Sequence, residues 1–261
     1  MAGYSLIRPL GFFYAIILII VLTYLWYSGR WKPKAGIIIL LITAALGFLI
    51  FAPVAPHQFQ ELIVRNTTSL GVSLIVAASG LFIIFVLTLV SGRFFCGYFC
   101  PVGALQELAS HVPVKKFQPK QKHVLIAVHG IFFILFLVMA FVFSFALLDY
   151  FGIRDFFALV LTTGSLVFLA ILLISVVFYR PFCRLICPYG ALLALAGSTS
   201  FLALQRTEAC IDCKNCELAC PVDEAKRDDR KGECYLCGRC TEACPKSGAL
   251  KYQWRVSRKK A

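Results

Sequence analysis

Eight cysteines near the carboxyl end occur in two runs of identical spacing, and this spacing restricts how that part of the chain folds. Each run reads C-x2-C-x2-C-x3-C-P, and Pro221 and Pro245 are the closing prolines. Three thiolates spaced in this way can wrap one corner of a cubane cluster within a tight loop. The proline after the fourth cysteine fixes φ and turns the chain away.

The repeated run is the ligand pattern of a two-cluster bacterial ferredoxin, in which the fourth cysteine of each run serves the other cluster. One 4Fe–4S cluster is therefore predicted to be held by Cys210, Cys213, Cys216 and Cys244. The second 4Fe–4S cluster is predicted to be held by Cys234, Cys237, Cys240 and Cys220. Zinc sites usually pair two C-x2-C knuckles, so neither zinc nor a disulfide framework matches this spacing.

The rest of the chain has the composition of a membrane protein. Of its 261 residues, 60% are hydrophobic, and the mean hydropathy is +0.82. A bilayer-spanning helix needs about 20 apolar residues, and five stretches are read as spans: 10–28, 35–54, 70–91, 124–148 and 158–179. The predicted fold is a membrane all-α helical bundle of about five transmembrane helices, residues 1–204. A small α+β two-cluster ferredoxin-like domain, 205–250, and a basic tail, 251–261, follow it.

The distribution of charge predicts the orientation in the membrane. The formal net charge is +13, and residues 1–204 contain 13 Lys and Arg against four Asp and Glu. Three connections are basic. The one between the first and second spans contains Arg30, Lys32 and Lys34. The one between the third and fourth spans contains Arg93, Lys115, Lys116, Lys120 and Lys122, and the one after the fifth span contains Arg180 and Arg184. The positive-inside rule places these connections in the cytoplasm and the amino terminus outside. Thiolate ligands also require a reducing compartment, so the ferredoxin domain is expected in the cytoplasm.

Three smaller segments complete the membrane interpretation. The aromatic residues Tyr24, Trp26 and Tyr27 suit an interface belt at the end of the first span. Residues 189–204 are apolar but too short to cross, and form either an interfacial helix or a helix beneath the bundle. The basic tail is either a solvated end or a contact with anionic lipid headgroups.

Four further cysteines lie in a second repeat. Residues 93–105 read RFFCGYFCPVGAL and residues 180–192 read RPFCRLICPYGAL, at a constant offset of 87 residues. Because repeats in membrane proteins commonly form a shared site, Cys96, Cys100, Cys183 and Cys187 are expected to come together. They ligate a third metal centre, form redox-active disulfides, line a quinol pocket or are buried inert thiols, and the residues alone leave these alternatives open.

Local sequence predicts the backbone around these cysteines. Proline disfavours a helical conformation in the residue before it and is favoured at the first position of a helix. Cys100 and Cys187 should therefore cap helices that begin at Pro101 and Pro188, where the helix N-terminus would lower the pKa of a thiol. Arg93 and Arg180, at matching positions of the repeat, are expected to add positive charge nearby.

Two C-x3-C-P motifs followed by the double cysteine run resemble the NapH-type membrane ferredoxins, over about residues 35–248. Those proteins are quinol-dehydrogenase subunits associated with periplasmic nitrate reduction. The same core resembles the carboxyl-terminal half of NosR and the oxidase-assembly protein CcoG. The resemblance implies that the eight tail cysteines are cluster ligands and that the four others are relevant to redox chemistry. The apparent extra first span departs from this pattern.

The histidines and one glutamate are further candidates for chemistry. Of the four histidines, His57, His111, His123 and His129, only the last lies in a predicted span. A haem usually needs two axial ligands, so a histidine satisfied by a backbone carbonyl is the preferred interpretation of His129. His111, His123 and Glu107 are weak candidates for proton transfer. Asn66 begins a short glycosylation sequon on the outer side.

The predicted function is membrane-bound electron transfer. Electrons would pass singly between a quinone, quinol or membrane redox subunit and a cytochrome or reductase partner, by way of the two clusters. The chain is then a subunit of an oxidoreductase, similar to a quinol dehydrogenase, in contact with membrane lipid. The alternative is an assembly or regulatory factor that reduces or senses a metal. Nucleic-acid binding lacks a basic helix or single-strand platform, and nucleotide-binding motifs are absent from the sequence.

Overall fold

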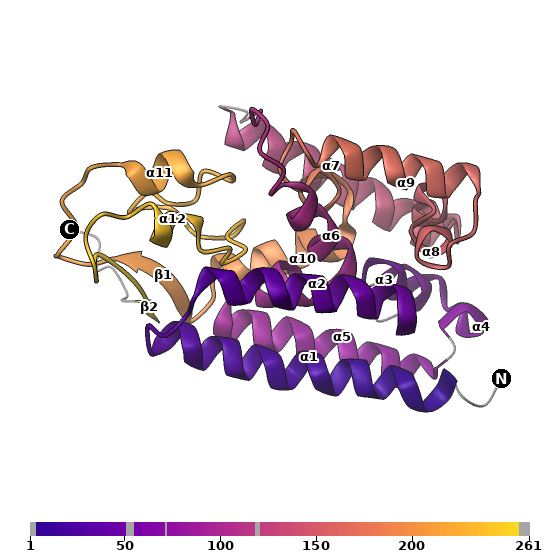
Figure 1. Ribbon diagram of the computed structural model, residues 1–261. Helices are drawn as coiled ribbons and strands as arrows, with labels where there is room; N and C mark the ends of the chain where they lie inside the picture. The colour runs from indigo at the N-terminus through magenta and orange to yellow at the C-terminus, as the bar shows by residue number, and fades with distance from the viewer. Residues whose placement is uncertain (1–3, 51–54, 71, 118–120, 256–261) are drawn as a thin grey trace.

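A computed structural model describes residues 4–50, 55–70, 72–117 and 121–255 (Figure 1), with side chains from Phe13 onward. The amino-terminal part is helical, and its longer helices are α1 (Tyr4–Tyr27), α2 (Pro33–Ile50), α5 (Leu74–Ser91), α7 (Lys122–Val142) and α9 (Thr163–Ile174). Shorter helices connect them: α3 (Ala55–Val64), α4 (Thr67–Leu70), α6 (Pro101–Ala109), α8 (Ile153–Phe157) and α10 (Pro188–Ser198). Three single turns are η1 (Phe95–Phe99), η2 (Leu147–Phe151) and η3 (Phe182–Ile186).

The two helices that follow the C-x3-C-P cysteines lie in the middle of the bundle (Figure 1). Helix α6 contacts α2 and α9, and α10 contacts α3, α5 and α7. Residues 189–198 therefore belong to a helix packed against the bundle, which favours the second of the two alternatives for this segment over an interfacial helix. Its buried face carries Tyr189, Leu193 and Ala196, each at most 2% exposed. The long helices thus enclose the repeat and its cysteines.

Two of the described helices, α5 and α7, are long and apolar enough to cross a membrane. Only 28% of the residues in the α5 segment and 17% in the α7 segment are buried within the protein. A core helix of a soluble protein would be mostly buried, whereas these helices expose apolar side chains around most of their circumference. Their outer surface therefore suits lipid rather than water.

The other predicted spans correspond to α1, α2 and α9, whose described apolar segments are Phe13–Tyr27, Ala35–Phe48 and Thr163–Ile174. Helix α9 begins only after Thr162, whose side chain forms a capping box with Ser165. The predicted span 158–179 is therefore too long at both ends, because capping begins the helix at Thr163 and it ends at Ile174. The predicted span 124–148 likewise extends too far at its carboxyl end, since α7 ends at Val142. Residues 51–54 and Lys120 lie outside the described residues.

The carboxyl-terminal part is a small α+β unit, as the sequence predicts. Strands β1 (Leu202–Arg206) and β2 (Leu250–Trp254) pair antiparallel, with Leu202 opposite Trp254. Between them lie α11 (Asn215–Ala219) and α12 (Arg239–Glu242), one in each cysteine run, and these two helices contact each other. The sheet begins before residue 205 and continues past residue 250, so both of its strands cross the predicted domain limits. Residues 256–261 of the basic tail lie outside the described residues.

Aromatic side chains join this unit to the bundle. Trp26 at the end of α1 stacks on Trp31 at 5.8 Å between ring centres and packs against Tyr252 of β2 at 6.1 Å. The Tyr252 hydroxyl donates a hydrogen bond to the Ser91 carbonyl, 2.6 Å away. Trp26 is only 5% exposed, so it belongs to this packed joint and its assignment to an interface belt is wrong. Tyr24 and Tyr27, in contrast, are exposed.

Candidate functional site

The two C-x3-C-P segments have the same local structure. In each, a single π-helical turn, η1 or η3, precedes the second cysteine. The amide of Cys100 bonds to the carbonyl of Phe95 at 2.9 Å, and the amide of Cys187 bonds to Phe182 at 2.9 Å. Isolated π-turns of this kind are frequent at functional sites. The repeat seen in the sequence is therefore also a repeat of backbone geometry.

Both second cysteines cap the helices predicted for them. Cys100 and Cys187 are extended N-cap residues, and α6 and α10 begin with the prolines that follow. The sulfur of Cys187 accepts a hydrogen bond from the Gly190 amide at 3.2 Å. Local sequence is sufficient to predict these caps. Proline restricts the backbone of the residue before it, and its own missing N–H favours it at the first position of a helix.

The four C-x3-C-P cysteines are all buried, between 5% and 7% exposed, and none forms a disulfide. Burial raises the pKa of Cys187 well above its ordinary value, and the neighbouring Cys183, Cys100 and Cys96 raise it further. Their mutual influence indicates that the four thiols are neighbours, as the repeat predicts. Two more sulfurs have donors: Gln106 reaches Cys183 at 3.4 Å, and Arg93 reaches Cys96 at 3.9 Å.

The predicted lowering of thiol pKa values by the helix N-termini is wrong for the free thiols. Burial raises the pKa of Cys183 to about 12, against the attraction of Arg180. It also raises the pKa of Cys100, and the neighbouring Cys183 adds to this rise. Desolvation disfavours the thiolate more than a helix terminus favours it. A bound cation would reverse this balance, because a coordinating thiol loses its proton outright.

Two arginines at matching positions of the repeat hold a tyrosine of the tail domain between them. Arg93 and Arg180 are fully buried, and each guanidinium lies 4.5 Å from the ring centre of Tyr235. Tyr235 lies between Cys234 and Cys237 of the second cysteine run and is 1% exposed. We call these three residues the arginine clamp. Cation–π contacts of this kind strengthen when they are desolvated.

Buried carboxylates balance the charge of the clamp. The Arg180 Nε donates to Glu107 at 2.9 Å, and Arg239 of the tail domain reaches the same carboxylate at 2.8 Å. Burial would raise the pKa of Glu107, but the two arginines and the Tyr179 hydroxyl lower it below its ordinary value. Glu107 therefore stays ionised as a structural partner, and the sequence-based proposal of a proton acceptor loses its support.

Glu233, beside Tyr235, forms the second charged contact between the tail domain and the repeat. Its carboxylate lies 3.4 Å from Arg93 and 3.4 Å from Arg184. Arg184 and Gly97 occupy equivalent positions in the two C-x3-C-P segments. One repeat thus offers a charge at this position, whereas the other offers only backbone.

Gly97 allows a backbone contact that a larger residue would prevent. A Cβ atom at Gly97 would lie 2.5 Å from the Tyr235 carbonyl oxygen. We expect Gly97→Ala to displace the Tyr235 loop, at a cost of about 1–3 kcal/mol, because overpacking forces the backbone to shift. Hydrogen–deuterium exchange of residues 232–238 should become faster. Gly130→Ala is the matched control, since a Cβ there has nothing within 4 Å, and equal exchange in both variants would contradict the expectation.

A pocket in the tail domain gathers four cysteines from both runs. Cys220 of the first run lines it together with Cys234, Cys237 and Cys240 of the second. The remaining wall includes Pro221, Val222 and the clamp residue Tyr235. Burial raises the pKa of Cys237 to about 12 and that of Cys234 to about 11. Four thiols around one largely apolar pocket are the donor set that a 4Fe–4S cluster requires.

The other predicted ligand set lies nearer the surface. Cys216 is buried in α11, Cys210 and Cys244 are half-buried, and Cys213 is exposed. The Cys210 sulfur lies 3.6 Å from an Asp212 oxygen, and the Cys244 sulfur lies 3.4 Å from the Lys246 carbonyl. The grouping of Cys244 with the first run stays a prediction.

Two histidines have backbone partners. His129 is buried in α7, and its Nε2 lies 2.9 Å from the Cys187 carbonyl, which confirms the preferred interpretation of this residue. His111 Nδ1 lies 2.8 Å from the Glu107 carbonyl. The bond from His129 ties α7 to the end of η3, so this histidine supports the cysteine site without being a ligand of it.

Comparison with known proteins finds a family match over the two C-x3-C-P regions. Residues 73–120 and 160–203 match a family described as a 4Fe-4S binding domain, and both C-x3-C-P segments lie within the matched regions. The chain is 34% identical over 192 residues to the uncharacterized protein MJ0750 of Methanocaldococcus jannaschii, covering 69% of this chain and 79% of the relative. No solved structure matches.

Two other relatives carry functional names. The putative electron transport protein YccM of Escherichia coli is 32% identical over 190 residues, covering 64% of this chain and 53% of YccM. The regulatory protein NosR of Pseudomonas aeruginosa is 31% identical over 163 residues, covering 56% of this chain and 23% of NosR. The chain thus spans about half of YccM and less than a quarter of NosR.

The matched regions place the chain among proteins with a 4Fe-4S binding domain. Within that class, the chain belongs to the same family as the archaeal protein MJ0750. Its own match to the 4Fe-4S binding domain covers residues 73–120 and 160–203.

Proposed function

We propose that this chain carries electrons between a membrane redox partner, such as the quinone pool, and a soluble redox enzyme. Two 4Fe–4S clusters in the tail domain, held by the two ligand sets predicted from the sequence, would serve as the carriers. Each cluster, when bound, accepts and releases single electrons. The four buried C-x3-C-P cysteines would form the contact with the membrane partner, as a third metal centre or as the lining of a quinol site.

The observation that carries this proposal is the insertion of the Tyr235 loop between the two repeats. Cys234 and Cys237 flank the residue that Arg93 and Arg180 enclose. Arg93 also contacts the Cys96 sulfur, and Arg180 donates to the Cys96 carbonyl at 2.5 Å. The predicted cluster pocket and the buried thiols are therefore joined through a short series of direct contacts. A purely structural joint would have no need for thiols on both sides.

A membrane location is supported by the apolar outer surfaces of α5 and α7, described above. We infer that the apolar helices α1, α2 and α9 lie in the bilayer with them. The tail domain lies at the basic end of the bundle, where Lys122 forms ion pairs with Glu224 at 2.9 Å and with Asp229 at 3.2 Å. The positive-inside rule then supports a cytoplasmic tail domain in the cell membrane.

The proposal predicts separate roles for the two groups of cysteines. Replacing both Cys96 and Cys183 with alanine should leave the iron content of the tail domain unchanged, because neither residue belongs to its ligand sets. The double variant should lose at least about 90% of the rate at which a quinol analogue bleaches the cluster absorbance under anaerobic conditions. A tenfold loss corresponds to about 1.4 kcal/mol of barrier.

Ser175→Ala is the control for this experiment, since Ser175 is a fully buried small polar residue of the bundle. The quinol analogue should reduce the clusters of this variant at the wild-type rate. Dithionite, a small soluble reductant, should reduce the tail clusters in all three proteins. If the Cys96 and Cys183 variant reacts with quinol at the wild-type rate, the buried thiols have only a structural role.

The similarity to NosR supports a second candidate, in which the chain reduces or senses a metal during assembly or regulation. In that case a cupric or ferric salt, rather than a quinone, would oxidise the reduced protein, and the oxidation would depend on the same buried thiols. Parallel oxidation assays with a quinone and with a cupric salt distinguish the two functions.

A further inference from the structure

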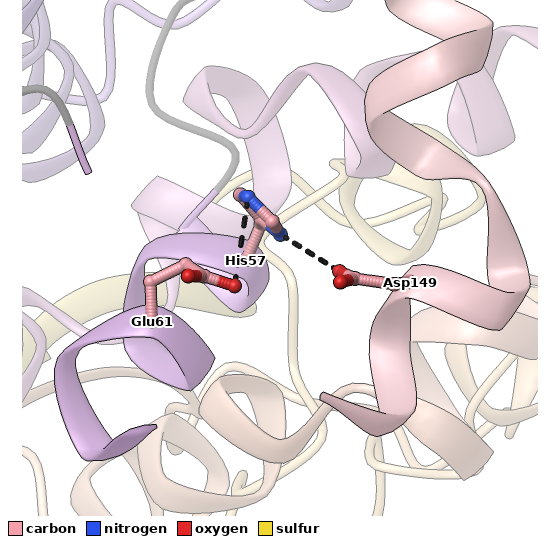
Figure 2. A group of neighbouring side chains, drawn as sticks. All are labelled: His57, Glu61 and Asp149. Carbon is pink, nitrogen blue, oxygen red and sulfur yellow. Dashed lines mark ion pairs between the residues drawn. The ribbon is translucent and has the colours of Figure 1, made fainter. Parts of the chain in front are cut away.

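Three ionisable side chains converge at the end of the bundle that lies away from the tail domain. His57 and Glu61 occupy successive turns of α3, and Asp149 lies in η2 (Figure 2). The His57 ring lies between the two carboxylates, with Nδ1 3.5 Å from Asp149 and Nε2 4.0 Å from Glu61. One nitrogen or oxygen of each residue lies within 4.8 Å of one such atom of the other two. These distances are too long for good hydrogen bonds.

Two buried atoms of the group have no hydrogen-bond partner among the described residues. They are Nε2 of His57 and Oε2 of Glu61. Glu61 is only 2% exposed, and its carboxylate points toward His57 in Figure 2. Burying a carboxylate without a full set of partners costs free energy of folding. A buried oxygen without a partner therefore indicates that a ligand binds there. Both orphaned atoms are good donors to a metal ion.

Gln60 holds the two carboxylates in place. Its side-chain amide donates to Asp149 at 3.1 Å and to Glu61 at 3.4 Å. Its carbonyl oxygen accepts a bond from the Leu148 amide, which ties α3 to η2. Gln60 is fully buried, so its position is determined by packing as well as by these bonds. Such outer contacts to ligating carboxylates are typical of metal sites.

We propose that His57, Glu61 and Asp149 bind a divalent cation that accepts nitrogen and oxygen ligands. One imidazole and two carboxylates suit Mn²⁺, Fe²⁺ or Zn²⁺, and the cation would balance two negative charges at this position. Arg154 is near enough to act electrostatically on His57. The site is separate from every cysteine in sequence and lies at the opposite end of the fold from the tail domain.

The test measures binding of Mn²⁺ to the full chain with its clusters assembled anaerobically in detergent. Mn²⁺ is the probe because it favours oxygen and nitrogen ligands over thiolates, so unoccupied cysteines would not compete for it. Electron paramagnetic resonance of free Mn²⁺ should report about one bound ion per chain. Glu61→Gln should weaken binding by at least about 100-fold, more than the roughly 10–100-fold typical of a lost outer contact.

Folding is separated from binding by a thermal measurement. Glutamine matches the shape of glutamate and removes a buried charge, so the metal-free variant should be at least as stable as the wild type. Mn²⁺ should raise the thermal midpoint of the wild type but not of Glu61→Gln. His123→Ala is the control, because it removes an exposed histidine at the other end of the bundle. Equal binding by Glu61→Gln and the wild type, or no binding by the wild type, would overturn the proposal.

Discussion

Replacing Cys220 with alanine is expected to remove the cluster of the second cysteine run and about half of the iron bound by the tail domain. The reason is that Cys220 shares a pocket with Cys234, Cys237 and Cys240, although it belongs to the first run. A ligand set of four thiolates leaves no spare donor when one is lost. Iron analysis and low-temperature electron paramagnetic resonance of the anaerobic protein measure the outcome.

Double variants reveal which cysteines share a cluster. Combining Cys220→Ala with Cys240→Ala should cost no more iron than either change alone, because both residues line the same pocket. Combining Cys220→Ala with Cys213→Ala should remove both clusters. The opposite pattern, in which Cys213 and Cys220 act on a single cluster, would disprove the exchange of fourth ligands between the runs. An iron-free protein loaded with zinc would disprove the cluster assignment itself.

Arg180→Met is expected to destabilise the protein by about 3–5 kcal/mol, the range for breaking one side of a buried ion pair. Arg180 is fully buried and pairs with Glu107 at 2.9 Å. It also donates to the carbonyls of Cys96 and Gly97, which would lose these partners. Because the same guanidinium stacks on Tyr235, both the repeat and the docked tail domain should loosen.

Thermal unfolding followed by cluster absorbance tests this expectation, with Arg227→Met as the matched control. The Arg227 side chain is 44% exposed and lies 3.6 Å from Asp212. Surface pairs of this kind contribute at most about 1 kcal/mol. Similar shifts of the thermal midpoint in the two variants would show that the clamp contributes no more than a surface contact.

Features that depend on neighbouring residues could be predicted from the sequence. The two C-x3-C-P motifs predicted the capping positions of Cys100 and Cys187 because proline restricts the residue before it. The preferred partner of His129, a backbone carbonyl, followed from its isolation in an apolar helix. The ends of the membrane segments were harder to predict, since hydropathy continues past Val142 although the helix does not.

Features that depend on distant residues were missed. The sequence placed positive charge near the cysteines, but the role of Arg93 and Arg180 as a clamp requires Tyr235 from the tail domain. The position of Gly97 opposite that loop leaves only a weak signal, its pairing with Arg184 in the repeat. In the sequence, Asp149 is only a charge beyond the predicted span 124–148, and nothing in the chain order places it beside His57.

The order of amino acids alone determined the kinds of ligand and the repeats, because cysteine spacing and proline act through short stretches of backbone. It also determined that much of the surface is apolar. Tertiary structure decided how deeply the thiols are buried, how far their pKa values rise, and which residue of the tail domain the two arginines contact. These properties depend on burial and on contacts between segments far apart in the chain, and no local pattern encodes either.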